Sequence, residues 1–119
     1  MNLTNGEPMI VNVTRNAVIA SRFKIAQDPW ARMKGLLGVR DFPQGEALVI
    51  THCQSIHMFF MKFPIDVIFC DRQNKVVGLC ERLKPFYLSP IFFKASYAIE
   101  LPSGIIASSK TQVGDQIQL

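Results

Sequence analysis

Several short motifs that mark common catalytic folds are absent from the sequence. There is no glycine-rich GxGxxG loop, no phosphate-binding loop ending in GKS or GKT, no HExxH motif, no GxSxG turn and no paired CxxC. Since such motifs build nucleotide, zinc and serine-nucleophile sites, their absence argues against nucleotide hydrolysis, hydride transfer and serine esterase chemistry. The residues by themselves name no cofactor, no metal and no reaction.

Cysteine and long apolar runs are also scarce. The three cysteines, Cys53, Cys70 and Cys80, are too few for a disulfide scaffold and are typical of reduced thiols in the cytoplasm. The longest stretch without Lys, Arg, Asp or Glu is Ala47 to Met61, whose fifteen residues include both histidines. It is too short and too polar to span a bilayer. The first twenty residues show no secretory leader. We therefore expect a cytoplasmic protein, or an extracytoplasmic one if a leader has been removed.

What remains is the composition of a globular domain. The chain has 119 residues, of which 49% are hydrophobic and 18% charged, and this composition excludes a disordered chain. The length is close to the commonest domain size. We predict a single domain over residues 1–119.

The positive charge is concentrated in one part of the chain. The net charge is +4, but residues 15–40 hold six basic residues against Asp28 alone, whereas the rest of the chain is nearly neutral. A basic cluster can attract nucleic acid, lipid headgroups or a phosphorylated ligand. No nucleic-acid motif accompanies it. The pattern therefore favours a solvated face, with nucleic-acid binding through residues 15–40 as an alternative.

The apolar pattern predicts a chain made mostly of strands. A helix of about ten residues begins at Asp28, a good N-cap, with Pro29 at the first helical position. A second short helix is predicted over residues 104–110. Strands are predicted over residues 9–14, 18–25, 47–51, 56–61, 65–70, 75–81, 96–101 and 115–119. The predicted fold class is α+β, mostly β: a small barrel-like or two-layer sheet domain with one or two short helices.

The only two histidines lie beside a cysteine in an otherwise apolar stretch. Three interpretations stay open. Cys53 and His57 could form a nucleophile and base. Cys53, His57 and Asp66 could bind a transition metal with one open position. Cys53 could instead be a buried small side chain while the histidines satisfy backbone groups.

Two carboxylates stand among apolar strand residues. Asp66 and Glu100 each have apolar neighbours, and burying a carboxylate is costly unless it is paired. Arg32 and Arg40 are the natural counter-ions. The pattern predicts either ion pairs that hold a helix against the sheet or a ligand-binding cleft.

The segment Pro85 to Phe93 (PFYLSPIFF) is unusually apolar for a loop and contains two prolines. Such a loop is typical of a lid, a ligand groove or a contact between copies of the chain in a homo-oligomer.

Four segments carry a resemblance to a known family. They are Arg32–Arg40 (RMKGLLGVR), Ser55–Asp71 (SIHMFFMKFPIDVIFCD), Tyr97–Gly104 (YAIELPSG) and Val113–Asp115 (VGD). In this order they resemble the hallmark segments of the "domain of unknown function 192" family of bacteria and archaea, from Ala17 to the C-terminus. The resemblance implies a small β-rich domain with a packed helix and no established activity.

The sequence thus predicts a binding module that recognises a small ligand or peptide through a polar cluster. Its predicted members are Arg32, Arg40, His57, Lys62, Asp66 and Glu100. The alternative is an enzyme, a hydrolase or transferase, that uses His57 with Asp66 or Cys53. The ligand or protein partner is not specified by the residues.

Overall fold

The structure is a computed structural model that describes residues 9–26, 42–59 and 61–119. Over these ranges the chain forms strands and one short helix. The strands are β1 (Ile10–Asn12), β2 (Ala17–Ala20), β3 (Arg22–Ala26), β4 (Glu46–Thr51), β5 (Ile65–Cys70), β6 (Val76–Leu83), β7 (Tyr97–Pro102) and β8 (Ile117–Gln118), and the helix is α2 (Ile105–Ser109).

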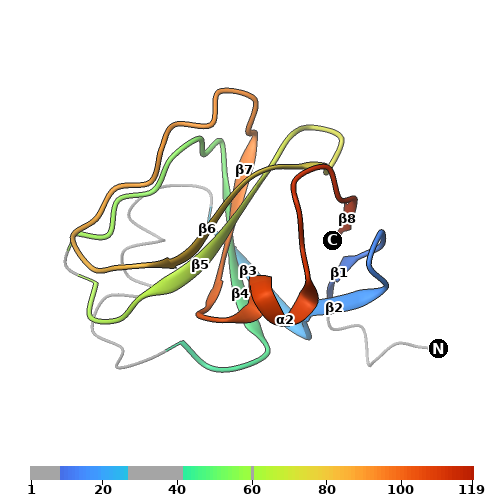
Figure 1. The fold of residues 1–119 in the computed structure, drawn as a ribbon, viewed down its shortest axis with the longest axis horizontal. Helices are drawn as coiled ribbons and strands as arrows, with labels where there is room; N and C mark the ends of the chain where they lie inside the picture. Colours follow the sequence, from blue (N-terminus) through green and yellow to red (C-terminus); the bar gives the residue numbers. More distant parts are fainter. Residues whose placement is uncertain (1–8, 27–41, 60) are drawn as a thin grey trace.

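The strands form two sheets (Figure 1). The large sheet has the order β3-β4-β7-β5-β6, and the small sheet has the order β2-β1-β8. The neighbours are antiparallel except β3 and β4, which are parallel. Over the described residues the sheets stay separate rather than closing into a barrel. The predicted α+β, mostly β class is confirmed in its two-layer form.

The large sheet is buried on both faces. One apolar cluster joins it to the small sheet and α2 through residues such as Ile10, Ile99 and Ile106. A second cluster lies on the opposite face and includes Phe69 and Met58. All residues of β5 and β7 are therefore buried, which explains why their sequences lack a clean alternation of apolar and polar residues.

The single strand predicted over residues 18–25 is wrong, because the chain bends at Ser21 and the two halves join different sheets. The N–H groups of Ser21 and Arg22 both donate to the carbonyl oxygen of Gly45, at 2.8 and 3.2 Å. The Ser21 hydroxyl donates to the same oxygen at 3.1 Å. The Gly45 carbonyl oxygen thus accepts the N–H groups of two successive residues. In a straight strand these two N–H groups would point to opposite sides, so the chain must bend here.

The strand predicted over residues 56–61 is also wrong. Residues 54–59 run beside residues 86–93 as an irregular pair, which we call the apolar arm, with one β-bridge between His57 and Leu88. Met58 and Tyr87 share a hydrogen bond of 2.9 Å, and Ser89 donates to the carbonyl oxygen of Ile56 at 2.9 Å. Pro85 and Pro90 have no N–H group to donate, so a regular ladder cannot extend along this pair.

The other local predictions divide between confirmed elements and residues outside the description. The short helix near residues 104–110 and the strand near the C-terminus are confirmed as α2 and β8. The helix predicted to begin at Asp28, together with Arg32 and Arg40, lies outside the described residues. In the described ranges, no helix is long and apolar enough to cross a membrane.

Candidate functional site

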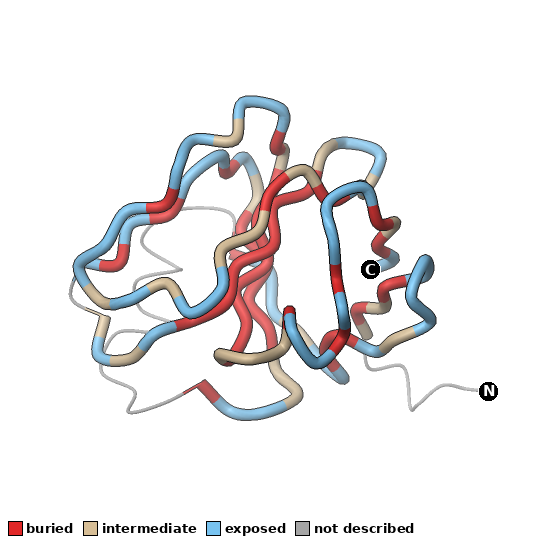
Figure 2. Tube along the Cα trace, in the orientation of Figure 1, coloured by how far each residue is buried: buried red, intermediate tan, exposed pale blue. Residues whose placement is uncertain are grey.

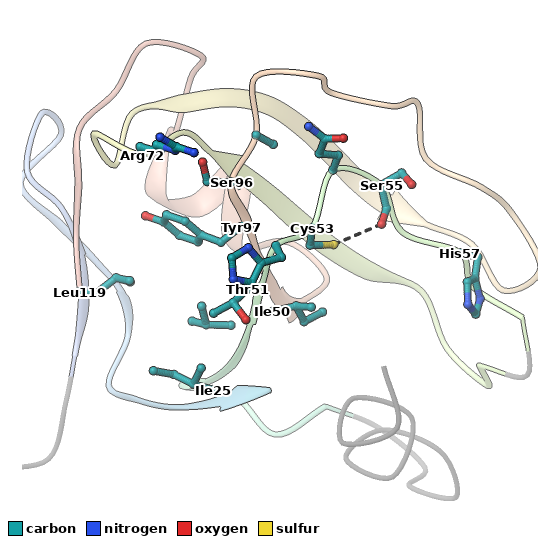
Figure 3. A pocket seen from close by; sticks show the side chains of 14 residues that line it. Ile25, Ile50, Thr51, Cys53, Ser55, His57, Arg72, Ser96, Tyr97 and Leu119 are labelled. Atoms are coloured by element: carbon teal, nitrogen blue, oxygen red, sulfur yellow. Dashed lines mark hydrogen bonds between the residues drawn. The ribbon is translucent and has the colours of Figure 1, made fainter. Parts of the chain in front are cut away.

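A hollow of about 1030 Å³ opens at one end of the large sheet (Figure 3). It is bounded by the ends of β3 and β4, the start of β7, the β5–β6 turn and the C-terminal residue. Its lining residues are Ile25, Val49, Ile50, Thr51, His52, Cys53, Gln54, Ser55, His57, Arg72, Ala95, Ser96, Tyr97 and Leu119. The cavity volume is of the size that small-molecule sites occupy.

Strand register explains how apolar and hydroxyl side chains come to line the same hollow. We call the part lined by aliphatic side chains such as Ile25 and Val49 the floor of the hollow. Thr51 lies opposite Tyr97, and Ile25 lies opposite Val49. Residues two apart on a strand share a face, so Val49 and Thr51 point to the same side of the sheet. Val49 and Ile50 come from within β4, whereas the hydroxyl groups of Thr51 and Tyr97 come from the end of β4 and the start of β7.

Tyr97 and Arg72 are the best-placed polar groups of the hollow. Figure 3 shows both beside Ser96 at one end. The Tyr97 hydroxyl donates to Oδ1 of Asn74 at 2.8 Å. Burial, followed by the nearby Cys70 thiol, raises the pKa of Tyr97 above its ordinary value, so its hydroxyl stays protonated at neutral pH.

The β5–β6 turn presents Arg72 as an exposed cation. Oδ1 of Asp71 accepts hydrogen bonds from the N–H groups of Gln73 and Lys75, at 2.9 and 3.0 Å. These bonds fix the backbone on both sides of the turn and leave the Arg72 side chain at its tip. The same hairpin thus supplies Asn74 to Tyr97 and Arg72 to the hollow.

A strained histidine follows β4 at the edge of the hollow. His52 has φ 52°, a left-handed conformation that costs a non-glycine residue about 1–3 kcal/mol. The next residue, Cys53, is held in place because its N–H group donates to the carbonyl oxygen of Ser96 at 3.3 Å. The Cys53 thiol donates to the carbonyl oxygen of Ser55 at 3.2 Å. The chain therefore turns sharply where it lines the hollow.

Asp66, a predicted site residue, is fully buried and is bonded to the backbone. Its Oδ1 accepts the N–H of Arg82 at 2.9 Å, and its Oδ2 accepts the N–H groups of Gly104 and Ile106, at 3.1 and 2.8 Å. The carboxylate thereby ties the end of β6 to the start of α2. His57 is not among its partners, so the enzymatic alternative that pairs His57 with Asp66 lacks its hydrogen bond.

The described members of the predicted polar cluster do not all share one face of the large sheet. Asp66 lies opposite Leu101 and Glu100 lies opposite Val67, so the two buried carboxylates point to opposite faces of the large sheet. Lys62 is exposed in the connection before β5. Among the described members only His57 lines the hollow, at the far end from Arg72 in Figure 3. A binding role for the six residues stays a prediction.

Two further hypotheses can be compared with the geometry. The metal site of Cys53, His57 and Asp66 is contradicted, because no three His, Cys, Asp or Glu residues in the described ranges are placed to hold a metal ion. In the basic segment 15–40, Arg15 pairs with Asp115 at 2.9 Å and Arg22 pairs with Glu46 at 2.7 Å. These pairs reduce the charge that the segment offers to a nucleic acid.

Sequence reasoning missed most of the hollow. Arg72 belongs to a turn that the sequence marks only as a connection, and Ser96 was predicted as the first residue of a strand but lies just before β7. The positive φ of His52 has no signal in the sequence. Tyr97 stands in one of the family-like segments, and the stretch with both histidines and Cys53, which the sequence also singled out, lines the hollow as well. What unites the lining residues is their position in space, since they come from five separate parts of the chain.

The sequence is similar to proteins without an assigned activity. The profile of the DUF192 family, described as "Uncharacterized ACR", matches residues 10–119. The UPF0127 protein of Thermococcus sibiricus is 34% identical over 113 residues, which cover 92% of this chain and 73% of that protein. The UPF0127 protein PH1112 of Pyrococcus horikoshii is 35% identical over 115 residues, which cover 92% of this chain and 97% of that protein.

Two crystal structures have a similar fold. A protein of unknown function from Novosphingobium aromaticivorans superposes with a TM-score of 0.78 at 16% identity, covering 93% of this chain and 82% of that one. A putative transcription regulator from Sinorhizobium meliloti superposes with a TM-score of 0.75 at 17% identity, covering 92% and 89%. Similarity at this low identity establishes the shared fold alone.

Proposed function

Since this chain belongs to the DUF192 family, which is described as uncharacterised, we propose its function from the geometry of the hollow: a non-enzymatic binding module for a small ligand or the end of a peptide. The observation that carries the proposal is an apolar floor beside a set of hydrogen-bonding groups in one open cavity. Ligand sites combine these two features, since apolar contact supplies affinity and a few polar groups set orientation.

The lining residues indicate the chemistry of the ligand. Arg72 offers a guanidinium group, which binds carboxylate or phosphate with two parallel hydrogen bonds. Tyr97 and Thr51 add hydroxyl groups to the lining, and Ile25 and Leu119 offer aliphatic surface. We therefore expect an amphipathic ligand, with one anionic group at the Arg72 end and an apolar body against the floor.

The residues predicted from the sequence take different parts in this proposal. His57 is kept as a contact at the opposite rim. Arg32, Arg40 and Lys62 remain proposed contacts for a ligand that extends beyond the hollow. Asp66 and Glu100 act through the fold, because both are buried and they face opposite sides of the sheet.

A thermal-shift titration of the full chain tests the proposal, with octanoate, phenylacetate, N-acetylated dipeptides and inorganic phosphate as probes. A probe at 100 times its Kd should stabilise the wild type by about 2.7 kcal/mol. The stabilisation should be lost in Arg72→Ala, which removes the anion contact, and in Thr51→Trp, which fills the cavity.

Lys75→Ala is the matched control, since it removes an exposed cation from the same hairpin without touching the hollow. It should bind like the wild type. The proposal is wrong if no amphipathic anion shifts the melting temperature, or if Thr51→Trp binds the probe as tightly as the wild type does.

A further inference from the structure

The apolar arm displays large hydrophobic side chains to solvent. Phe93 is 79% exposed, and Phe86 and Leu88 are each 64% exposed. Tyr87, Ile91 and Phe59 are also exposed on the arm. A cluster of this kind is unusual on a protein surface and marks a contact site. In Figures 1 and 2 the arm lies at the opposite end of the molecule from β8 and the C-terminus.

The arm is held in place by contacts that leave these side chains outside. The N–H of Phe86 donates to the carbonyl oxygen of Met58 at 2.8 Å, and Nε2 of Gln54 donates to the carbonyl oxygen of Phe93 at 2.8 Å. Phe92 turns the other way and packs against Phe69, with ring centroids 4.6 Å apart. One phenylalanine thus anchors the arm on the core while its neighbours face solvent.

Within the two segments that form the arm and its flanks, the charged side chains all have one sign. Residues 52–64 and 82–96, which form the arm and its flanks, contain no Asp or Glu. They contain four exposed cations: Lys62, Arg82, Lys84 and Lys94. The Lys84 ammonium lies 6.0 Å from the centre of the Tyr87 ring, so cation and aromatic ring stand on the same surface.

We propose that the apolar arm docks on the surface of an anionic lipid bilayer. Exposed Phe, Tyr, Leu and Ile side chains enter the boundary between headgroups and acyl chains, and flanking Lys and Arg side chains contact lipid phosphates. A second copy of the chain is a poorer occupant, because a two-fold contact would bring two identical cationic surfaces together. The proposal concerns a surface separate from the Arg72 end of the hollow and does not depend on a ligand there.

Vesicle co-sedimentation of the full chain tests this. One set of vesicles consists of phosphatidylcholine alone and the other of equal parts phosphatidylcholine and phosphatidylglycerol. The wild type should bind the anionic vesicles more tightly, and added NaCl should weaken that binding, because salt screens the headgroup charge. Equal binding to both sets would overturn the proposal.

Two double variants separate the apolar and the electrostatic contributions. Phe86→Ser with Phe93→Ser should lower vesicle affinity about tenfold or more, since it removes the most exposed rings. Lys84→Gln with Lys94→Gln should lower affinity about five-fold for each charge removed. All four side chains are exposed, so the variants should keep the wild-type melting temperature.

Matched controls lie at the other end of the molecule. Val18→Ser with Val113→Ser removes two exposed apolar side chains, and Lys110→Gln removes one exposed cation; both should bind vesicles like the wild type. The proposal fails if the phenylalanine variant binds as the wild type does. It also fails if sedimentation velocity shows that the wild type is a dimer and the phenylalanine variant is not, while anionic vesicles bind neither protein. The arm would then contact a second copy of the chain.

Discussion

At the scale of single residues, Asp66 shows how a buried charge organises its surroundings. Three backbone N–H groups from two elements converge on one carboxylate. Two of them, from Gly104 and Ile106, stand at the start of α2, where a helix has N–H groups without partners in its own first turn. The sequence reasoning that a buried Asp66 needs partners was sound, but it looked to arginine side chains rather than to the backbone.

Asp66→Asn should destabilise the protein by about 1–3 kcal/mol, because the amide NH₂ would face at least one of the three N–H donors and leave it unsatisfied. Asp71→Asn is the matched control: its carboxylate also accepts two backbone N–H groups, but in an exposed turn where water can replace them. Urea unfolding should show the smaller loss, below about 1 kcal/mol, for Asp71→Asn. Equal losses would contradict the structural role of Asp66.

At the scale of elements, β6 and the apolar arm fit together at one glycine. A methyl group at Gly78 would overlap the ring of Phe92, the residue that anchors the arm. The same ring packs on Phe69 of β5. The absence of a side chain at Gly78 therefore allows the arm to lie close against the sheet, and with it the position of the exposed aromatics.

Gly78→Ala should cost about 1–3 kcal/mol through overpacking against Phe92. In a Phe92→Ala background the added methyl has room, so most of that penalty should disappear from the urea unfolding free energy. Phe86→Ala is the control background, since Phe86 lies on the same arm but faces solvent, and there the penalty should persist in full. Additive losses in the Phe92→Ala background would refute this contact.

At the scale of the whole molecule, the two ends of the described chain are joined through Asp115. Arg15 Nε and Asn12 Nδ2 donate to Oδ2 of Asp115, at 2.9 and 3.0 Å. These bonds link β1 and its turn to the segment before β8, and β1 pairs with β8 in the small sheet. Burial by itself would raise the pKa of Asp115, but the hydrogen bonds from Arg15, Asn12 and Gln112 outweigh it and hold the pKa below its ordinary value.

This lowered pKa predicts a pH-dependent stability. In the unfolded chain the Asp115 carboxylate takes up a proton below its ordinary pKa of about 3.9, whereas in the folded chain it stays ionised to lower pH. The free energy of unfolding therefore falls as the pH drops through the folded pKa of Asp115. Asp115→Asn should be less stable than the wild type at neutral pH and should lose less on acidification, so the two unfolding curves converge at low pH. Glu46→Gln, at an exposed ion pair, should show a much smaller change. Parallel curves for Asp115→Asn and wild type would disprove the linkage.

Local signals predicted some elements better than others. The strand β5 was predicted with its observed bounds, because a run of six residues that is apolar except for Asp66 stands between Pro64 and the turn that begins at Asp71. The neighbouring apolar run over residues 56–61 failed, because its backbone bonds to residues 86–89 rather than to a sheet. Hydrophobicity alone does not distinguish these outcomes, since both runs are rich in strand-forming residues.

The sequence by itself determined the α+β, mostly β class, the turn between β5 and β6 and the family, since composition, apolar runs and short motifs are local properties of the chain. Only the tertiary structure decided which sheet each half of residues 18–25 joins, which groups bind Asp66, and which residues line the hollow. It also decided that Phe92 is an anchor while Phe93 is exposed. The physical reason is common to all four: each depends on contacts between residues far apart in the sequence, and no local pattern records where those partners lie.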